Sequence, residues 1–109
     1  MTGNLGRKPG TSRIGTTFSP LTVQAVWEKG RRIPGRDPDV VRLDACGAEM
    51  YRNLYGDTTP RGRGWEIDHI VPVARSGSDD LANLQPLQWE NNRGKSDNYP
   101  NWTCSVRAA

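Results

Sequence analysis

The sequence predicts a small single domain of the α+β class, and three observations carry this prediction. The chain has 109 residues, enough for one domain with a small core. Residues 19–30 show the start signal and apolar spacing of a helix, whereas residues 65–70 alternate as a strand does. Because the chain contains 12 glycines and 8 prolines, we expect short elements joined by loops.

The first 18 residues are expected to form a flexible basic arm ahead of a domain that spans residues 19–109. The arm is rich in Gly, Ser, Thr, Arg and Lys, so it has little apolar surface to bury. Basic residues outnumber acidic ones up to Arg42, and acidic ones outnumber basic ones from Leu43 onward. This asymmetry suits a protein that holds phosphates at one end, and it also suits a solvated basic tail.

A short N-terminal helix is predicted to follow the arm. Ser19 fits the N-cap and Pro20 the first helical position, while Val23, Val26 and Trp27 share one face. The four tryptophans of the chain are suited to stack on bases. In so small a domain, however, we expect them to build the core.

The rest of the chain is expected to alternate short elements with loops. Residues 40–55 have no clean hydrophobic period, so we expect a strand or turn at 45–48 and then a helical or extended stretch. Residues 56–64 form a loop whose Arg61-Gly62-Arg63-Gly64 stretch either contacts phosphate or is a solvated turn. After the strand at 65–70, we predict a long connection, a second strand at 84–87 and a helix at 88–96.

Residues suited to metal-assisted hydrolysis lie along this last region. His69 is the only histidine of the chain, and alone it would be taken as structural. It follows Asp68, however, and precedes Asn83, Asn92 and Lys95. Imidazole accepts protons near neutral pH, and carboxylate and carboxamide oxygens suit Mg²⁺ or Mn²⁺. The grouping predicts a metal-dependent site that cleaves phosphodiesters, with Lys95 one helical turn from Asn92 and placed to meet a phosphate.

The adjacency of Asp68 and His69 sets a geometric condition. Neighbouring residues on a strand point to opposite faces, so the strand must end or twist at this pair if both are to serve one ion. Pro72 and the loop after it permit such a turn. We expect the Asn83 carboxamide to bond backbone groups across the loop and so hold His69 in place.

The pattern Asp-His-Ile-x-Pro, Asn-Leu-Gln-x-Leu and Asn-x-x-Lys-x-Asp, within residues 65–98, resembles the HNH endonucleases, also called ββα-metal or His-Me finger nucleases. Residues 92–98 are also similar to the HNH domain of RNA-guided CRISPR effector nucleases. The stretches 26–30 and 42–48 look like a small HNH subfamily of bacteria and phages. The resemblance implies a ββα-metal finger and a DNA endonuclease of weak sequence preference that leaves 5′-phosphate and 3′-hydroxyl ends.

Carried over by position, the resemblance implies a role for each residue of the motif. His69 becomes the general base, Asp68 and Asn92 the metal ligands, and Asn83 the residue that pins the loop. Supporting or phosphate-binding roles fall to four further residues: Glu66, Glu90, Arg93 and Lys95. The third letter of the motif is Asn92 rather than His, so the chain is an HNN variant.

The cysteine content bears on metal binding and on cross-linking. The cysteine knuckles of many relatives are missing, because Gln88 and Asn91 stand at those places. The chain has two cysteines and one histidine in all. We therefore expect no structural zinc, which needs about four such ligands. Cys46 and Cys104 are able to close a long loop as a disulfide, but two buried thiols are the expectation in a reducing cytosol.

The sequence also bears on where the protein is located and on which other functions it could have. No apolar run approaches the roughly 20 residues that span a membrane, and the N-terminus has no signal-like apolar core, so we expect a cytoplasmic protein without a membrane partner. One rival function is a catalytically inactive nucleic-acid-binding module of the same fold. Another is a nuclease that prefers RNA or branched DNA. The sequence leaves open the oligomeric state and the choice between nicking and double-strand cleavage.

Overall fold

The computed structural model describes residues 7–107 and has short helices and strands joined by loops. In chain order these are α1 (Pro20–Trp27), β1 (Val41–Leu43), β2 (Glu49–Tyr51), β3 (Trp65–His69), β4 (Leu84–Gln88) and α2 (Trp89–Lys95). Single 3₁₀ turns lie at Arg52–Leu54, Val73–Arg75 and Leu81–Asn83. The architecture confirms a small α+β domain.

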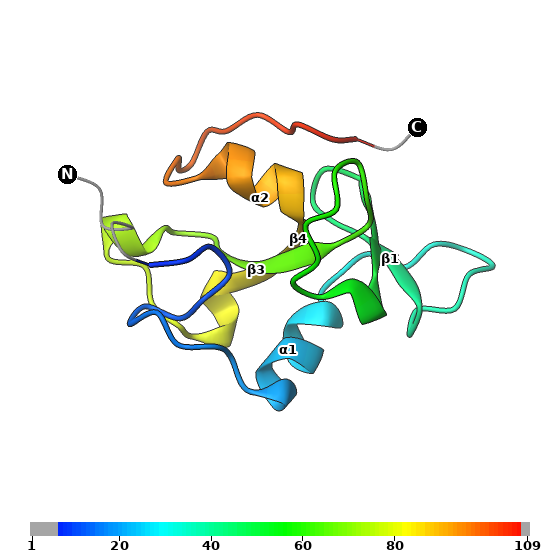
Figure 1. Ribbon diagram of the computed structural model, residues 1–109, viewed down its shortest axis with the longest axis horizontal. Coiled ribbons are helices and arrows are strands. Elements are labelled where there is room, and N and C mark those ends of the chain that lie inside the picture. The colour runs from blue at the N-terminus through cyan, green and yellow to red at the C-terminus, as the bar shows by residue number, and fades with distance from the viewer. Residues whose placement is uncertain (1–6, 108–109) are drawn as a thin grey trace.

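The centre of the molecule is the antiparallel hairpin of β3 and β4. Its register places Trp65 opposite Gln88 and His69 opposite Leu84. Helix α1 lies on one side of the hairpin and α2 on the other (Figure 1). Every residue of β3 is buried because both of its faces are covered. The order of β3, β4 and α2 along the chain confirms the predicted succession of strand, connection, strand and helix.

The core lies between α1 and the central hairpin. Ser19 caps α1, its hydroxyl accepting a hydrogen bond from the Thr22 amide at 3.2 Å. Val23, Val26 and Trp27 turn inward as predicted, and the Trp27 ring lies 5.2 Å from that of Trp65. Trp27 and Trp65 are completely buried. These two tryptophans therefore build the core and are not available to stack on bases.

A second hairpin, formed by β1 and β2, was not predicted. The expected turn at residues 45–48 is present, with the Asp44 amide donating to the Ala48 carbonyl at 2.9 Å. A strand lies on each side of it, paired so that Val41 faces Tyr51. Strand β2 agrees with the extended alternative expected after residue 48. Strands of three residues are too short to show an alternating pattern, which is why the sequence revealed neither β1 nor the pairing.

A buried carboxylate joins this second hairpin to the beginning of α2. Asp44 accepts four hydrogen bonds of 2.8 to 3.0 Å, three from the backbone amides of Cys46, Ala48 and Gln88 and one from the Asn91 side chain. Bonds to a charged acceptor are stronger than neutral ones. We call Asp44, Gln88 and Asn91 the anchor cluster, because it fixes where α2 begins.

The C-terminal segment runs back over α2 and is held there by two devices (Figure 1). The Asn91 carboxamide oxygen accepts from the amides of Ser105 and Val106, at 2.8 and 2.7 Å. Cys46 and Cys104 form a disulfide with a Cα–Cα distance of 5.9 Å. The expectation of two free thiols was therefore wrong. A sequence separation of 58 residues gave no sign that the returning segment brings these two cysteines together.

The described part of the expected basic arm, residues 7–18, packs against the domain. Gly10 lies against the Glu66 side chain on β3, and Ser12 is buried. The Arg13 amide donates to the Asp79 carboxylate at 3.0 Å. The remaining expected arm residues, 1–6, lie outside the described part of the chain. Between residues 7 and 107, no helix has the length and apolar character needed to cross a membrane.

Candidate active site

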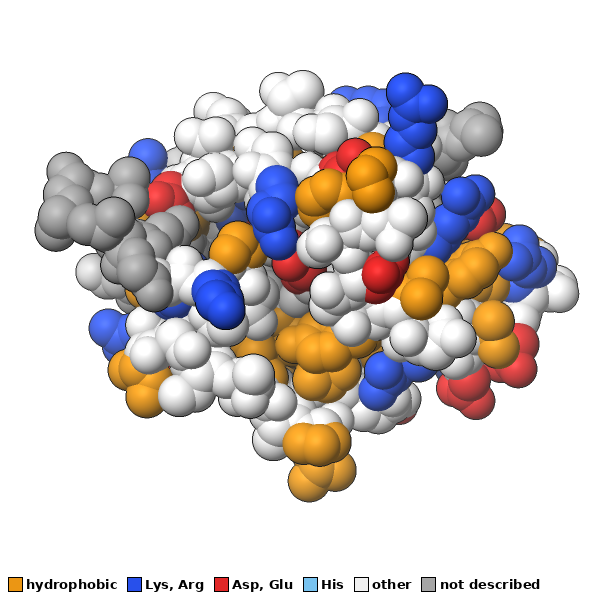
Figure 2. Space-filling view, in the orientation of Figure 1, with side chains coloured by type: hydrophobic (Ala, Val, Ile, Leu, Met, Phe, Trp, Pro, Cys, Tyr) orange, Lys and Arg blue, Asp and Glu red, His pale blue; other side chains and the backbone are white. Residues whose placement is uncertain are grey.

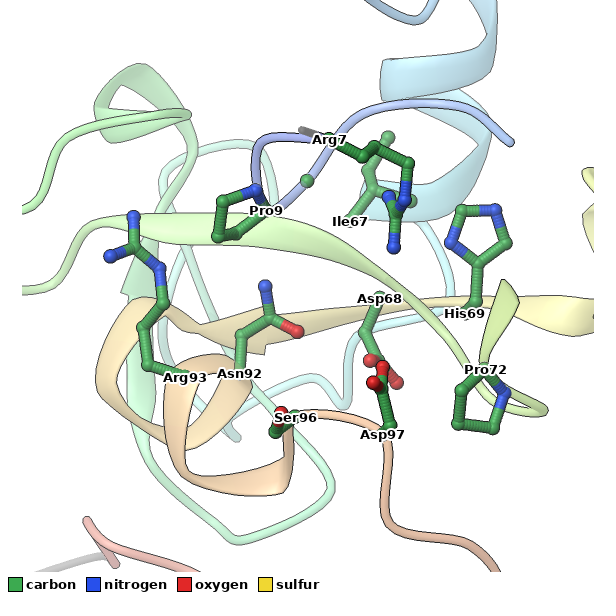
Figure 3. Close-up of a pocket in the computed structure, with 11 residues that line it drawn as sticks. Arg7, Pro9, Ile67, Asp68, His69, Pro72, Asn92, Arg93, Ser96 and Asp97 are labelled. Carbon is green, nitrogen blue, oxygen red and sulfur yellow. The ribbon is translucent and has the colours of Figure 1, made fainter. Parts of the chain in front are cut away.

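A cavity of about 120 Å³ opens where β3 ends beside α2 (Figure 3). It is lined by residues of the N-terminal segment, of β3 and the turn after it, and of α2 and the residues after it: Arg7, Pro9, Gly10, Ile67, Asp68, His69, Pro72, Asn92, Arg93, Ser96 and Asp97. The structure thus brings four of the predicted site residues to one cavity, namely Asp68, His69, Asn92 and Arg93.

Strand β3 sorts its side chains between two sides. Trp65 and Ile67 join the core, whereas Glu66 and Asp68 bond to side chains of α2. The expectation that the strand ends or twists at this pair was wrong, because Asp68 and His69 both pair with β4 as part of the strand. Their side chains leave the strand in opposite directions (Figure 3). Both still line the cavity because it lies at the end of the strand.

Asp68 is a buried carboxylate with two polar partners. The Lys95 ammonium lies 3.3 Å from its Oδ1, and Gln85 Nε2 donates to its Oδ2 at 2.9 Å. Burial raises the pKa of Asp68 above its ordinary value, because desolvation outweighs the opposing effects of Lys95, Gln85 and His69. A partly compensated carboxylate of this kind gains from a further positive charge.

Lys95 is itself buried, with 1% of its surface exposed. Besides contacting Asp68, its Nζ donates to the His69 carbonyl at 2.9 Å. The ammonium therefore contacts both residues of the Asp-His pair and faces away from solvent. Of the two roles predicted for Lys95, this placement suits support of the site and not direct contact with phosphate.

Asn92 and Arg93 are both held by Glu66. Asn92 Nδ2 donates to Glu66 Oε1 at 2.9 Å, and Arg93 forms an ion pair with Glu66 Oε2 at 3.0 Å. With its nitrogen committed in this way, the Asn92 carboxamide directs Oδ1 toward Asp68 (Figure 3). Glu66 thus orients an oxygen donor, while Arg93 keeps 44% of its side chain exposed.

The loop after His69 is tied together by Asn83. Its Oδ1 accepts from the Val71 amide at 2.8 Å, and its Nδ2 donates to the carbonyls of Val71 and Ser78 at 3.1 and 2.8 Å. The Asn83 carbonyl also accepts from the Ile70 amide. Asn83 does not line the cavity, so it acts on the site through the backbone that follows His69.

The structure also reveals a partner of His69 that the sequence did not. Asp79 Oδ1 lies 2.7 Å from His69 Nε2. The ring itself is buried, with 4% of the side chain exposed, and it lies near Phe18. Residues 76–80 lie in the long connection predicted after the strand at 65–70, and two consecutive aspartates in a loop give no sign of which one folds back onto the histidine.

Glu90 does not belong to this site, contrary to expectation. Its Oε1 accepts from the Arg61 amide at 3.2 Å and from Gln88 Nε2 at 3.1 Å. It lies in the first turn of α2, whereas Asn92 lines the cavity from further along the helix. Glu90 therefore fixes the loop before β3 to α2 and is not placed to support a metal ion.

The oxygen donors of the cavity fit a hard divalent cation. Asp68 provides a carboxylate and Asn92 a carboxamide oxygen directed toward it. Residues 7–107 contain no group of three or more His, Cys, Asp or Glu side chains suited to a metal. Asp68 and Asn92 would hold a cation here with water and phosphate completing its shell, an arrangement that Mg²⁺ accepts.

Comparison with known proteins agrees with this geometry. Residues 61–101 match the family model described as HNH endonuclease, a span that contains β3, β4 and α2. The match supports the resemblance inferred from the motif, and this part of the chain is similar to the HNH endonucleases. The family indicates a nuclease-type domain and a nucleic-acid substrate. No curated protein and no solved structure gave a significant match to the chain.

Proposed function

We propose that the protein is a DNA endonuclease that hydrolyses phosphodiester bonds with Mg²⁺ or Mn²⁺. The observation that carries the proposal is the cavity at the end of β3, where an imidazole, a carboxylate and a carboxamide meet. The family match supports the nuclease class. The choice of DNA rests on the resemblance of the motif, and the choice of cation on the chemistry of the oxygen donors.

In this proposal His69 removes the proton from the attacking water. Imidazole is the side chain whose ordinary titration range lies nearest neutral pH, and the chain has only this one. Its burial at the wall of the cavity limits its motion. General-base catalysis of this kind typically contributes about 10²- to 10⁴-fold in rate.

Asp68 and Asn92 are the residues that would hold the cation. When bound, a divalent cation supplies positive charge to the phosphate and to the departing oxygen. Lys95 keeps Asp68 in position and tethers the backbone of His69. Glu66 keeps the Asn92 oxygen directed toward Asp68. The chain therefore orients both ligands through buried partners.

Arg7 and Arg93 line the cavity, and we expect them to contact the substrate backbone there. On the face shown in Figure 2, Lys and Arg side chains are spread out and interleaved with acidic ones. Such a surface favours a few phosphate contacts over a continuous basic track. Contacts to phosphate carry no sequence information and weaken with salt, so we expect weak sequence preference and strong salt dependence.

A substrate panel tests the proposal. The full chain is incubated with supercoiled plasmid, single-stranded DNA, branched DNA and RNA, each with Mg²⁺, with Mn²⁺ or with EDTA. We expect cleavage of DNA with either cation and none in EDTA. Cleavage confined to RNA or to branched DNA would replace the substrate assignment. Binding without cleavage of any of the four would instead identify an inactive nucleic-acid-binding module.

A further inference from the structure

Asp79 contacts the one histidine of the chain from outside the HNH motif residues. Its Oδ1 lies 2.7 Å from His69 Nε2, within hydrogen-bond distance. A carboxylate can only accept hydrogen bonds. In this contact Nε2 must therefore carry the proton and donate it to Asp79.

The two ring nitrogens of His69 face different surroundings. In Figure 3, Nδ1, the nitrogen nearer to Cβ, lies on the side of Arg7 and Asp68, whereas Nε2 lies on the far side of the ring. A neutral imidazole has one protonated nitrogen and one with a lone pair. With the proton held on Nε2, the lone pair is on Nδ1 and faces the cavity.

Asp79 is itself fixed by the N-terminal segment. The Arg13 amide donates to both carboxylate oxygens, at 3.0 and 3.3 Å. Arg13 belongs to a tight turn in which the Ser12 amide donates to the Thr16 carbonyl and the two hydroxyls of Ser12 and Thr16 bond at 2.7 Å. A hydrogen-bonded turn thus holds the carboxylate that reaches the histidine.

We propose that Asp79 is a positioning residue that holds His69 as the Nε2–H tautomer, so that Nδ1 is the atom that accepts the proton of water. The carboxylate does not touch substrate and acts only through the ring. Its effect on cleavage rests on the proposed function, whereas its effect on the tautomer does not. A role limited to folding would leave both the tautomer and the turnover number of the folded protein unchanged.

The variant Asp79→Asn tests this inference. Asparagine can still accept from the Arg13 amide through its oxygen, but its nitrogen presents a donor to Nε2 and favours the opposite, Nδ1–H tautomer. Asp80→Asn is the matched control. It removes the same charge from the next residue, which is exposed and whose backbone bonds to Ser78 and Asn83.

Two readouts are needed, and both use the full chain. The first is the long-range ¹⁵N–¹H spectrum of the imidazole near pH 8, which is unambiguous because there is one histidine. We expect protonated Nε2 in the wild type and in Asp80→Asn, and protonated Nδ1 in Asp79→Asn. The second is the cleavage rate, for which Asp79→Asn is expected to lower kcat by about 10²-fold or more with little change in KM.

The outcomes separate this inference from the proposed function. A wild-type ring protonated on Nδ1 would overturn the inference, and so would an Asp79→Asn protein with wild-type tautomer and kcat. Because the wild-type spectrum decides the tautomer alone, a variant that fails to fold does not remove the test. If Asp79→Asn switches the tautomer but the wild type cuts no substrate, the assignment of Asp79 to the ring stands and the proposed function falls.

Discussion

Two faces of α2 carry neighbouring asparagines with opposite surroundings. Asn91 belongs to the anchor cluster, where its oxygen and nitrogen bond to Asp44 and to the C-terminal segment. Asn92 faces the cavity, and only its nitrogen is committed, to Glu66. Buried polar groups that form hydrogen bonds with one another stabilise a fold, whereas a polar atom directed into a cavity is available to bind a ligand. The comparison separates stability from function within one turn of helix.

The largest expected effect is a crossed result for these two asparagines. Asn92→Ala removes an oxygen donor of the cavity, so we expect cleavage to fall by at least the roughly 10- to 100-fold that even outer partners of a metal cause. Asn91→Ala leaves buried amides unpaired and should lower the free energy of unfolding by about 3 kcal/mol. Cleavage rates and urea unfolding of both variants measure the contrast. If Asn92→Ala lost stability and kept activity, the assignment of Asn91 to stability and Asn92 to cleavage would be wrong.

Removal of the disulfide should affect stability alone. The variant with both Cys46→Ala and Cys104→Ala frees the C-terminal segment, and closure of a loop of this length contributes roughly 4 kcal/mol in the chain-entropy model. We expect a lower melting temperature and an unchanged kcat at temperatures where the variant is folded. Treatment of the wild type with a reductant is the matched control. A large loss of kcat in the folded variant would show that this segment also shapes the site.

A smaller loss of stability is expected from Asp44→Asn. The new side chain has one acceptor oxygen, so its nitrogen would meet the donors of Gln88 and Asn91 that now bond to Oδ2. Loss of such charge-assisted bonds costs about 2–3 kcal/mol. Denaturant unfolding gives the free energy, and the cleavage rate of the folded variant should remain that of the wild type. A variant as stable as the wild type would contradict the claim that Asp44 stabilises the beginning of α2.

The smallest expected effect is a pH dependence of stability that belongs to Asp68. Its raised pKa means that the folded protein holds this proton more tightly than the unfolded chain does. The contribution of Asp68 to the free energy of unfolding therefore falls as pH rises from the ordinary value of 3.8 through the raised pKa. Urea unfolding in EDTA over this range should show that part of the slope, and Asp68→Asn should lack it. An identical slope in both proteins would contradict the assignment.

The sequence predicted the central elements because their signals are local. The Ser19-Pro20 start and the apolar face of α1, and the alternation of β3, depend only on neighbouring residues. The motif spacing likewise predicted that Asp68, His69 and Asn92 share one site, and the three residues line one cavity. What the sequence did not reveal depends on contacts between distant segments: the Cys46–Cys104 disulfide, the anchor cluster and the approach of Asp79 to the histidine.

His69 is the group on which the proposed cleavage depends most, and its replacement tests this dependence most directly. The measurement is the initial rate at which the full chain nicks supercoiled plasmid with Mg²⁺, for the wild type and for His69→Ala, with DNA binding measured in parallel. General-base catalysis predicts a loss of about 10²-fold or more, with DNA binding by the folded variant retained. A His69→Ala protein that nicks plasmid at the wild-type rate would contradict the account.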